Sequence, residues 1–189
     1  MLTLWKCIIQ PKLDYCSQLW SPSDQDSINV IENVQEHFLS KVAETSALNH
    51  WERLNYLKMY SQERRRERYM VILVWKIAEN MVQGYDLKFS EMENGRRGRM
   101  ALPKPIVRTA PASVRRARES SLAVKGCQLF NLLPPNIRNM KGCSVDVFKR
   151  AVDTFLATLP DQPTVIGLTR AAITNSLIDQ VAMQVGTNS

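Results

Sequence analysis

The stretch SQERRRERYMVILVWKIAENMVQG, residues 61–84, decides how the chain is expected to fold. The serine at its start can cap a helix, and Gly84 can close that helix in the left-handed conformation, so we expect the helix to run to about Val82. Residues 62–68 are almost wholly charged, whereas residues 69–77 are apolar on nearly every side. The second half of this helix therefore needs packing partners all round.

Shorter amphipathic helices are predicted on both sides of this segment. Apolar residues recur at intervals of three and four over 28–38, and Asn49 with Glu52 forms a capping box for another helix. Ser144 can cap a further helix with a broad apolar stripe over 148–159. These patterns predict a mostly α-helical protein, a small helical bundle.

The first twenty residues are expected to form two short helical pieces that meet at Pro11, because proline lacks a backbone donor and restricts the residue before it. Ser23 with Asp26 then forms a weak capping box for the helix that follows. The apolar residues expected to line the buried sides of the two pieces are Leu4, Ile8, Leu13, Tyr15, Leu19 and Trp20.

The stretch from Arg96 to Arg118 has a different composition. It holds eight Lys or Arg residues, no Asp or Glu, and prolines at positions 103, 105 and 111. Because proline interrupts regular helix, this composition predicts a basic loop or a short β-hairpin around 96–118. Residues 100–102 and 106–108 are the expected edge strands.

The chain is thus expected to have four parts. Residues 1–84 form an N-terminal helical part, 85–120 the basic loop or hairpin, 121–160 a C-terminal helical pair, and 161–189 a weakly ordered tail of polar character. The sequence contains no internal repeat.

Lysine and arginine outnumber aspartate and glutamate by 25 to 18, which gives a formal net charge of +7. This balance favours an anionic partner no more than it favours a solvated basic face. No apolar run approaches the roughly 18 to 20 residues that span a bilayer, and the first residues lack the basic leader and cleavage site of a secretory signal. We therefore expect an intracellular protein, cytoplasmic or nuclear, without membrane contact.

Several short blocks occur in one order over residues 8–156. The blocks are PKLDYCSQLWSP (11–22), IENVQ (31–35), WERL (51–54), ERRR (63–66), RGR (97–99), FNLLP (130–134) and VFK (147–149). In this order they resemble the region that follows the palm and thumb in jockey-like non-LTR (LINE-type) retrotransposon reverse transcriptases. The resemblance implies an accessory region of an RNA-directed DNA polymerase, whose partners are the RNA or DNA backbone and the palm and thumb of the parent polymerase.

The catalytic signature of such a polymerase is missing. The polymerase needs paired aspartates on a tight hairpin to hold two magnesium ions, and no Asp-Asp dipeptide occurs here. The nearest pattern, Asp24-Gln25-Asp26, starts a predicted helix, where carboxylates satisfy backbone amides. The four cysteines contain no C-x-x-C pair, so no zinc site is expected either. The resemblance therefore implies a non-catalytic C-terminal fragment with no enzymatic activity, no cofactor and no small-molecule substrate; magnesium would belong to the missing palm.

Two basic clusters supply the candidate nucleic-acid-binding residues. The first lies in the opening turns of the helix that starts at Ser61, where the helix dipole disfavours cations. Either a polyanion or an acidic surface elsewhere in the parent polymerase compensates that cost, or the arginines form a solvated, internally salt-bridged face that can pin the helix to neighbouring carboxylates. The second cluster has no acidic neighbour and is expected to follow a phosphate chain. The first cluster comprises Arg64, Arg65, Arg66 and Arg68, and the second comprises Arg96, Arg97, Arg99, Lys104, Arg108, Arg115, Arg116 and Arg118.

Aromatic residues are absent from 96–118, so contact with the nucleic-acid backbone is expected rather than base stacking. Trp5, Trp20, Trp51 and Trp75 are expected to anchor the core instead. Two other functions stay open. The chain can be a helical protein-interaction or scaffold module whose apolar stripes dock another protein, or a retroelement remnant without a selected role.

Overall fold

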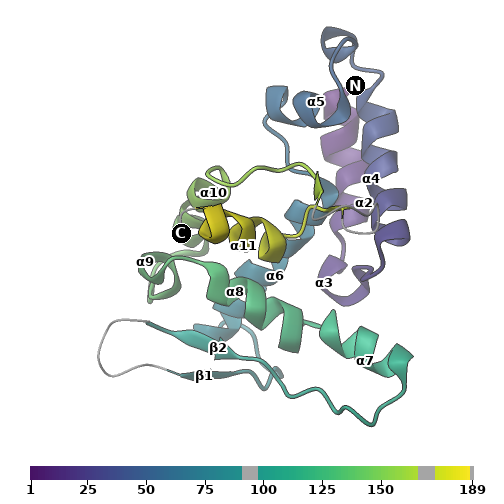
Figure 1. Cartoon of the computed structure of the whole chain (residues 1–189). Coiled ribbons are helices and arrows are strands. Elements are labelled where there is room, and N and C mark those ends of the chain that lie inside the picture. The colour runs from purple at the N-terminus through teal and green to yellow at the C-terminus, as the bar shows by residue number, and fades with distance from the viewer. Residues whose placement is uncertain (91–97, 166–172, 188–189) are drawn as a thin grey trace. The chain divides into compact units, whose positions relative to one another are not determined.

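The longest helix, α6 (Gln62–Ala78), links two separately packed units of a mostly α-helical chain (Figure 1). The computed structural model describes residues 1–90, 98–165 and 173–187. One unit comprises Met1–Arg66 and Asp161–Ser176, and the other comprises Glu67–Pro160 and Leu177–Ser189, so the division falls within α6. The predicted fold class is confirmed. The four expected parts differ from this division, because each unit contains a piece of the expected tail.

Helix α6 begins as predicted but ends earlier than expected. The Ser61 hydroxyl accepts the backbone N–H of Arg64 at 3.1 Å, which confirms the cap. At the other end the helix is closed by Asn80, which has φ of 56°; Gly84 also has a positive φ, of 85°, but it lies beyond the helix end. The N–H of Met81 donates to the carbonyl of Lys76 at 2.9 Å, the bond that closes a Schellman turn. Asparagine tolerates positive φ well enough to end the helix there.

The chain start is one helical segment and not two pieces joined at Pro11. It consists of α1 (Leu2–Leu4), the π-helical turn η1 (Trp5–Ile9) and α2 (Gln10–Asp14). The Gln10 N–H donates to the Trp5 carbonyl, five residues back. This wider turn lies directly before Pro11, where an α-helix would lose a bond and meet the proline ring. The break comes at Cys16, with φ of 50°, and α3 (Ser17–Trp20) follows it.

Three further helices complete the first unit. They are α4 (Gln25–Leu39), the 3₁₀ turn η2 (Ala43–Thr45) and α5 (His50–Tyr56). The expected capping box of Asn49 and Glu52 is present, whereas α4 is capped by Asp24 instead of Ser23. Apolar packing centres on Leu39, Val42 and Leu54, with Leu2, Phe38, Trp51, Leu57 and Met59 around them.

The expected buried residues at the chain start lie mostly on the surface. Tyr15 and Leu19 are each 76% exposed, and Leu4, Ile8 and Trp20 are also exposed. The inward positions are instead occupied by the side chains of Trp5, Gln10 and Ser17, all buried. The expectation failed because the buried face of this segment carries polar residues, which a pattern of apolar spacing does not register.

The second unit packs around the apolar half of α6. Its other helices are α7 (Ala112–Glu119), the π-helical turn η3 (Leu122–Gly126) with α8 (Cys127–Leu132), α9 (Pro135–Arg138) and α10 (Val145–Leu156). Ser144 caps α10 as predicted. The Trp75 ring stacks on Phe148 at 4.3 Å between centroids, and its indole N–H donates to the carbonyl of Met140 at 2.9 Å.

A small β-hairpin also belongs to this unit. Strands β1 (Lys88–Ser90) and β2 (Met100–Leu102) pair antiparallel, so the first of the two expected edge strands is confirmed. The side chain of Asn131 on α8 exchanges two hydrogen bonds of 2.8 Å with the backbone of Ala101 and fixes β2 against that helix. Residues 106–108 form no strand.

The expected weakly ordered tail is wrong for the part that the structure describes. Strands β3 (Thr164–Val165) and β4 (Ile173–Thr174) pair antiparallel, and α11 (Leu177–Thr187) follows. The Leu177 side chain is buried and its N–H donates to the Glu67 carboxylate at 2.7 Å. Such long-range polar anchors leave no periodic signal in the sequence.

Neither a membrane-spanning helix nor a metal-holding cluster occurs among the described residues. None of these helices combines the length and the apolar character that crossing a bilayer requires. Over the same residues, no group of three or more His, Cys, Asp or Glu side chains is placed to hold a metal ion.

Candidate nucleic-acid interface

Helix α7 occupies the end of the stretch for which a loop or hairpin was expected, so that prediction is wrong for residues 112–119. All three prolines of the stretch lie before the helix. Pro111 is its N-cap, with φ of −52°, and its carbonyl accepts the N–H of Arg115 at 3.0 Å. Alanine and arginine, which favour helix, supply most of the residues that follow. Proline therefore marks the start of a helix here and not its absence.

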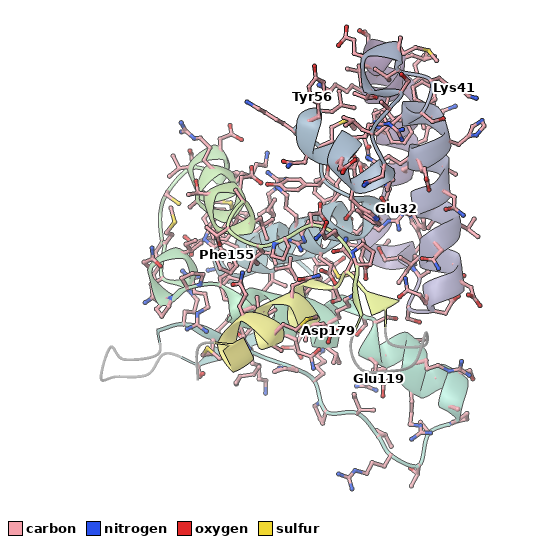
Figure 2. The ribbon with its side chains drawn as sticks, turned by 45° about the horizontal axis from the view of Figure 1, so that its top comes forward. Glu32, Lys41, Tyr56, Glu119, Phe155 and Asp179 are labelled. Carbon is pink, nitrogen blue, oxygen red and sulfur yellow. The ribbon has the colours of Figure 1, made fainter. Side chains whose placement is uncertain are left out.

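Every residue of α7 is exposed, and Figure 2 labels Glu119 at its end. Arg115, Arg116 and Arg118 lie on this helix, and Arg108, also exposed, lies shortly before it. Within the described part of the chain, none of these four guanidinium groups has a hydrogen bond or an ion pair. We name these four residues the α7 surface. It offers unpaired cations to solvent.

The position of these arginines on the helix is also favourable. Arg116 and Arg118 lie in the last turn of α7, where the negative end of the helix dipole stabilises cations. The helix dipole therefore favours their charges, which need no carboxylate for compensation at this position.

Lys104 is intermediate in exposure between the arginines of the α7 surface and the buried arginines. Its ammonium is 3.4 Å from the Asp86 carboxylate, and both side chains are solvent-accessible. Its backbone N–H donates to the carbonyl of Ala123 at 3.0 Å and ties the segment after β2 to η3. An exposed pair of this kind is weak, so the ammonium can exchange its partner for a phosphate.

The arginines in the first turns of α6 make internal pairs instead. Arg65 donates to both carboxylate oxygens of Asp14, with Nη2 to Oδ2 at 2.8 Å. Arg68 likewise holds Asp153 in a two-point pair, with Nη2 to Oδ2 at 2.7 Å. The structure thus favours the internally salt-bridged alternative left by the sequence, in which these arginines pin the helix to carboxylates of the same chain.

Arg64 and Arg66 are removed from solvent. The Arg64 side chain is 0% exposed, with Nε 3.9 Å from Asp161, and Arg66 is 5% exposed. The Arg66 guanidinium lies 4.8 Å from the centre of the Trp20 ring. Burial lowers the pKa of Arg66, while nearby carboxylates oppose that shift. Neither guanidinium is available to a phosphate, so both are corrections to the expected site.

Carboxylates also neutralise the start of α6. Glu32 on α4, labelled in Figure 2, accepts the N–H of Gln62 at 2.8 Å and contacts His50 Nε2 at 2.9 Å. Asp161 accepts the N–H of Ser61 at 2.8 Å and its hydroxyl at 2.7 Å. Negative charge at a helix N-terminus is stabilising. These two carboxylates make the arginine-rich first turns tolerable.

Arg99 is likewise a structural residue. Its Nη1 and Nη2 each donate to Glu79 Oε1 at 2.8 Å; the Arg99 side chain is buried, and that of Glu79 is 10% exposed. Glu79 Oε2 accepts the N–H of Gly142 at 2.7 Å, so the pair joins the end of α6 to the loop before α10. Arg99 therefore leaves the candidate site. Arg96 and Arg97 lie outside the described residues.

Trp20 departs from its expected role. Trp5 and Trp75 are fully buried core anchors as predicted, whereas Trp20 is exposed and holds Arg66 beneath it. Its indole N–H donates to the Tyr15 carbonyl at 2.7 Å. The only sequence signal for this pairing is the presence of both residues, since they lie far apart along the chain.

Comparison with known proteins adds no relative. No family model, no curated protein and no solved structure matches the chain. The candidate interface is therefore defined by its own geometry.

Proposed function

We propose that the chain binds the phosphate backbone of RNA or DNA, without sequence preference, through the α7 surface. One observation carries this proposal. Arg108, Arg115, Arg116 and Arg118 are exposed and unpaired within the described part of the chain, whereas the arginines of α6 and Arg99 are paired or buried. Unpaired guanidinium groups are the best phosphate ligands among side chains, because their planar donors match phosphate oxygens.

The composition of the surface favours backbone contact over base recognition. No aromatic residue occurs in 98–118, so bases have no ring on which to stack. Contact to phosphates positions a nucleic acid without reading its sequence. Affinity that comes from phosphate contacts falls steeply with salt, because binding releases condensed counterions.

The ordered blocks support a reverse-transcription context for this proposed activity. They resemble the region after the palm and thumb of jockey-like non-LTR reverse transcriptases, and the paired aspartates of the palm are missing from the sequence. We therefore infer a non-catalytic role in which the chain supports an RNA-directed DNA polymerase by holding its template or product. Magnesium and the nucleotide would belong to the palm.

Titration across a salt series tests the proposal. Labelled single- and double-stranded RNA and DNA of mixed sequence are titrated at several salt concentrations, and the logarithm of affinity is plotted against the logarithm of salt. Changing Arg115, Arg116 and Arg118 together to Gln is expected to reduce the slope by roughly 0.7 to 0.9 for each phosphate group that the variant no longer neutralises. An unchanged slope would remove the α7 surface from the site.

A matched control separates this surface from net charge. Lys6, Lys12 and Lys41 are exposed residues of the other unit, and changing all three to Gln removes the same charge. This variant is expected to keep a slope close to that of the parent chain. Equal losses in the two variants would indicate a diffuse electrostatic effect and contradict a defined surface.

A second candidate function rests on the exposed apolar side chains of the first unit. Leu4, Ile8, Tyr15 and Leu19 are all exposed, and such residues are typical of protein-docking surfaces when they are contiguous. A helical interaction module of this kind predicts self-association or capture of another protein. Light scattering at high salt distinguishes it from nucleic-acid binding, because only the protein contact persists there.

A further inference from the structure

Two serines, Ser120 and Ser121, directly follow helix α7. Ser121 has Arg118 three residues before it and Arg116 five residues before it, with Arg115 adjacent to the latter. Protein kinases select substrates largely by charge pattern. Arginines at these two spacings suit a kinase whose substrate cleft is acidic.

The Ser121 hydroxyl is placed to accept a phosphoryl group. Its side chain is partly exposed, and its hydroxyl donates to the carbonyl of Arg118 at 2.6 Å. Its backbone is extended, with φ of −69° and ψ of 158°, between the end of α7 and the start of η3. The acceptor residue itself therefore already has an extended backbone, between two helical neighbours.

The arginines before Ser121 can be presented in the same extended form. Helix α7 has eight residues and buries none of them. Isolated helices shorter than about 12 residues are marginal in water, and segments with few buried contacts open most readily. Opening α7 would cost little and would align Arg116 and Arg118 with Ser121 in one strand.

We propose that Ser121 is the phosphorylation site of an arginine-directed Ser/Thr protein kinase, and that its phosphorylation switches off polyanion binding by the α7 surface. The second clause rests on the proposed function. In the reaction the Ser121 Oγ attacks the γ-phosphorus of ATP, and the bond from that phosphorus to the β,γ-bridging oxygen breaks. The products are phosphoserine and ADP, and the hydroxyl proton passes to a carboxylate of the kinase.

Charge arithmetic gives the expected effect. The side chains of residues 112–121 carry three positive charges and one negative charge, a net of +2. A phosphoserine adds about −1.5 to −2 at neutral pH. One phosphate therefore cancels nearly all of the local positive charge, and it also offers an internal partner to the arginines that would otherwise contact nucleic acid.

The acceptor is tested on the full chain by phosphate mapping. The chain is incubated with Mg-ATP and the catalytic domain of protein kinase B, chosen as an arginine-directed probe, and the product is mapped by mass spectrometry. We expect one phosphate on Ser121, loss of it in Ser121→Ala, and retention in the matched neighbour Ser120→Ala. Changing Arg116 and Arg118 to Gln should slow phosphorylation at least tenfold.

The lysine variant at positions 6, 12 and 41 should be phosphorylated at the parent rate, since its changes lie away from the acceptor. Phosphate on Ser120 or elsewhere, or undiminished phosphorylation of Ser121→Ala, would overturn the assignment. All the substituted side chains are at least partly exposed, so the variants are expected to fold like the parent chain. Circular dichroism of each variant checks that it does.

The switch is tested separately with the phosphorylated chain. If the modified surface neutralises about two fewer phosphate groups of the nucleic acid, the salt slope should fall by roughly 1.4 to 1.8. A chain phosphorylated on Ser121 with an unchanged slope would overturn the switch alone. A chain that accepts phosphate on Ser121 but binds no nucleic acid before modification would overturn both the switch and the proposed function, and would leave the acceptor assignment standing.

Discussion

Arg65 and Asp14 form a two-point ion pair between α6 and α2, with Arg65 Nε at 2.9 Å and 3.0 Å from the two carboxylate oxygens and Nη2 at 2.8 Å from Oδ2. The same carboxylate accepts a hydrogen bond of 2.8 Å from the side chain of Gln10. A residue from a cluster expected to bind nucleic acid thus holds the first unit together.

Asp14→Asn is expected to lower the free energy of unfolding by about 1 to 2 kcal/mol, between the values for exposed and buried pairs, because the pair is half-buried. Urea unfolding followed by circular dichroism measures the change. Asp26→Asn, at an exposed position in the first turn of α4, is the control and should cost less than about 1 kcal/mol. Equal losses in both variants would contradict a structural role for the pair.

Glu79→Gln should destabilise the chain by about 3 kcal/mol, because it leaves the buried Arg99 guanidinium without its carboxylate. The double variant Glu79→Gln with Arg99→Met removes the uncompensated charge and should recover part of the loss. The measurement is a double-mutant cycle on denaturant unfolding. Additive losses in the double variant would show that the two residues do not interact.

Phe148→Ala should lower the free energy of unfolding by about 3 to 5 kcal/mol, since it empties the position against which Trp75 stacks. Val147→Ala, one residue earlier and on the exposed side of α10, should cost less than about 1 kcal/mol. Near-ultraviolet circular dichroism reports the same site through the tryptophan. A spectrum unchanged by Phe148→Ala would argue against the stacked arrangement.

Burial raises the pKa of the Cys127 thiol to about 11 from the ordinary 9.0. The unfolded thiol ionises near pH 9 while the folded thiol stays neutral, so the unfolded state binds fewer protons and stability falls as the pH rises from about 9 to 11. Cys127→Ala should show a smaller fall over this window. Unfolding at pH 8, 9.5 and 11 measures the difference between the two chains.

A thiol reagent gives an independent reading of the same cysteine. At pH 8 it should modify the exposed Cys7 and Cys16 rapidly and Cys127 only after unfolding. Rapid modification of Cys127 in the native chain would contradict its burial.

The parts of the fold that the sequence predicts are those with local causes. Ser61, Ser144 and the Asn49 and Glu52 pair cap their helices because each bond joins residues three apart in the chain. The helix end at Asn80 was missed because glycine is the more usual left-handed residue, and Gly84 lies only four residues further on.

The residues of the candidate site likewise divide into those whose role the sequence predicts and those whose role only the fold reveals. The positive charge of α7 is visible in the sequence because no acidic residue precedes Glu119 in that stretch. The burial of Arg64 and the pairing of Arg65 and Arg68 are not, since Asp161, Asp14 and Asp153 lie far from them along the chain. Counting charges identifies basic segments, and only the fold separates cations that face solvent from those that hold helices in place.

Because the chain passes from one unit to the other within α6, returns at Asp161 and leaves again after Ser176, neither unit is a continuous stretch of polypeptide. During synthesis from the N-terminus, the ribosome releases most of the second unit before Asp161 exists to hold the amide and hydroxyl of Ser61. The unit that is begun first is therefore expected to be finished late, and a nascent chain that stalls before residue 176 leaves both of them incomplete.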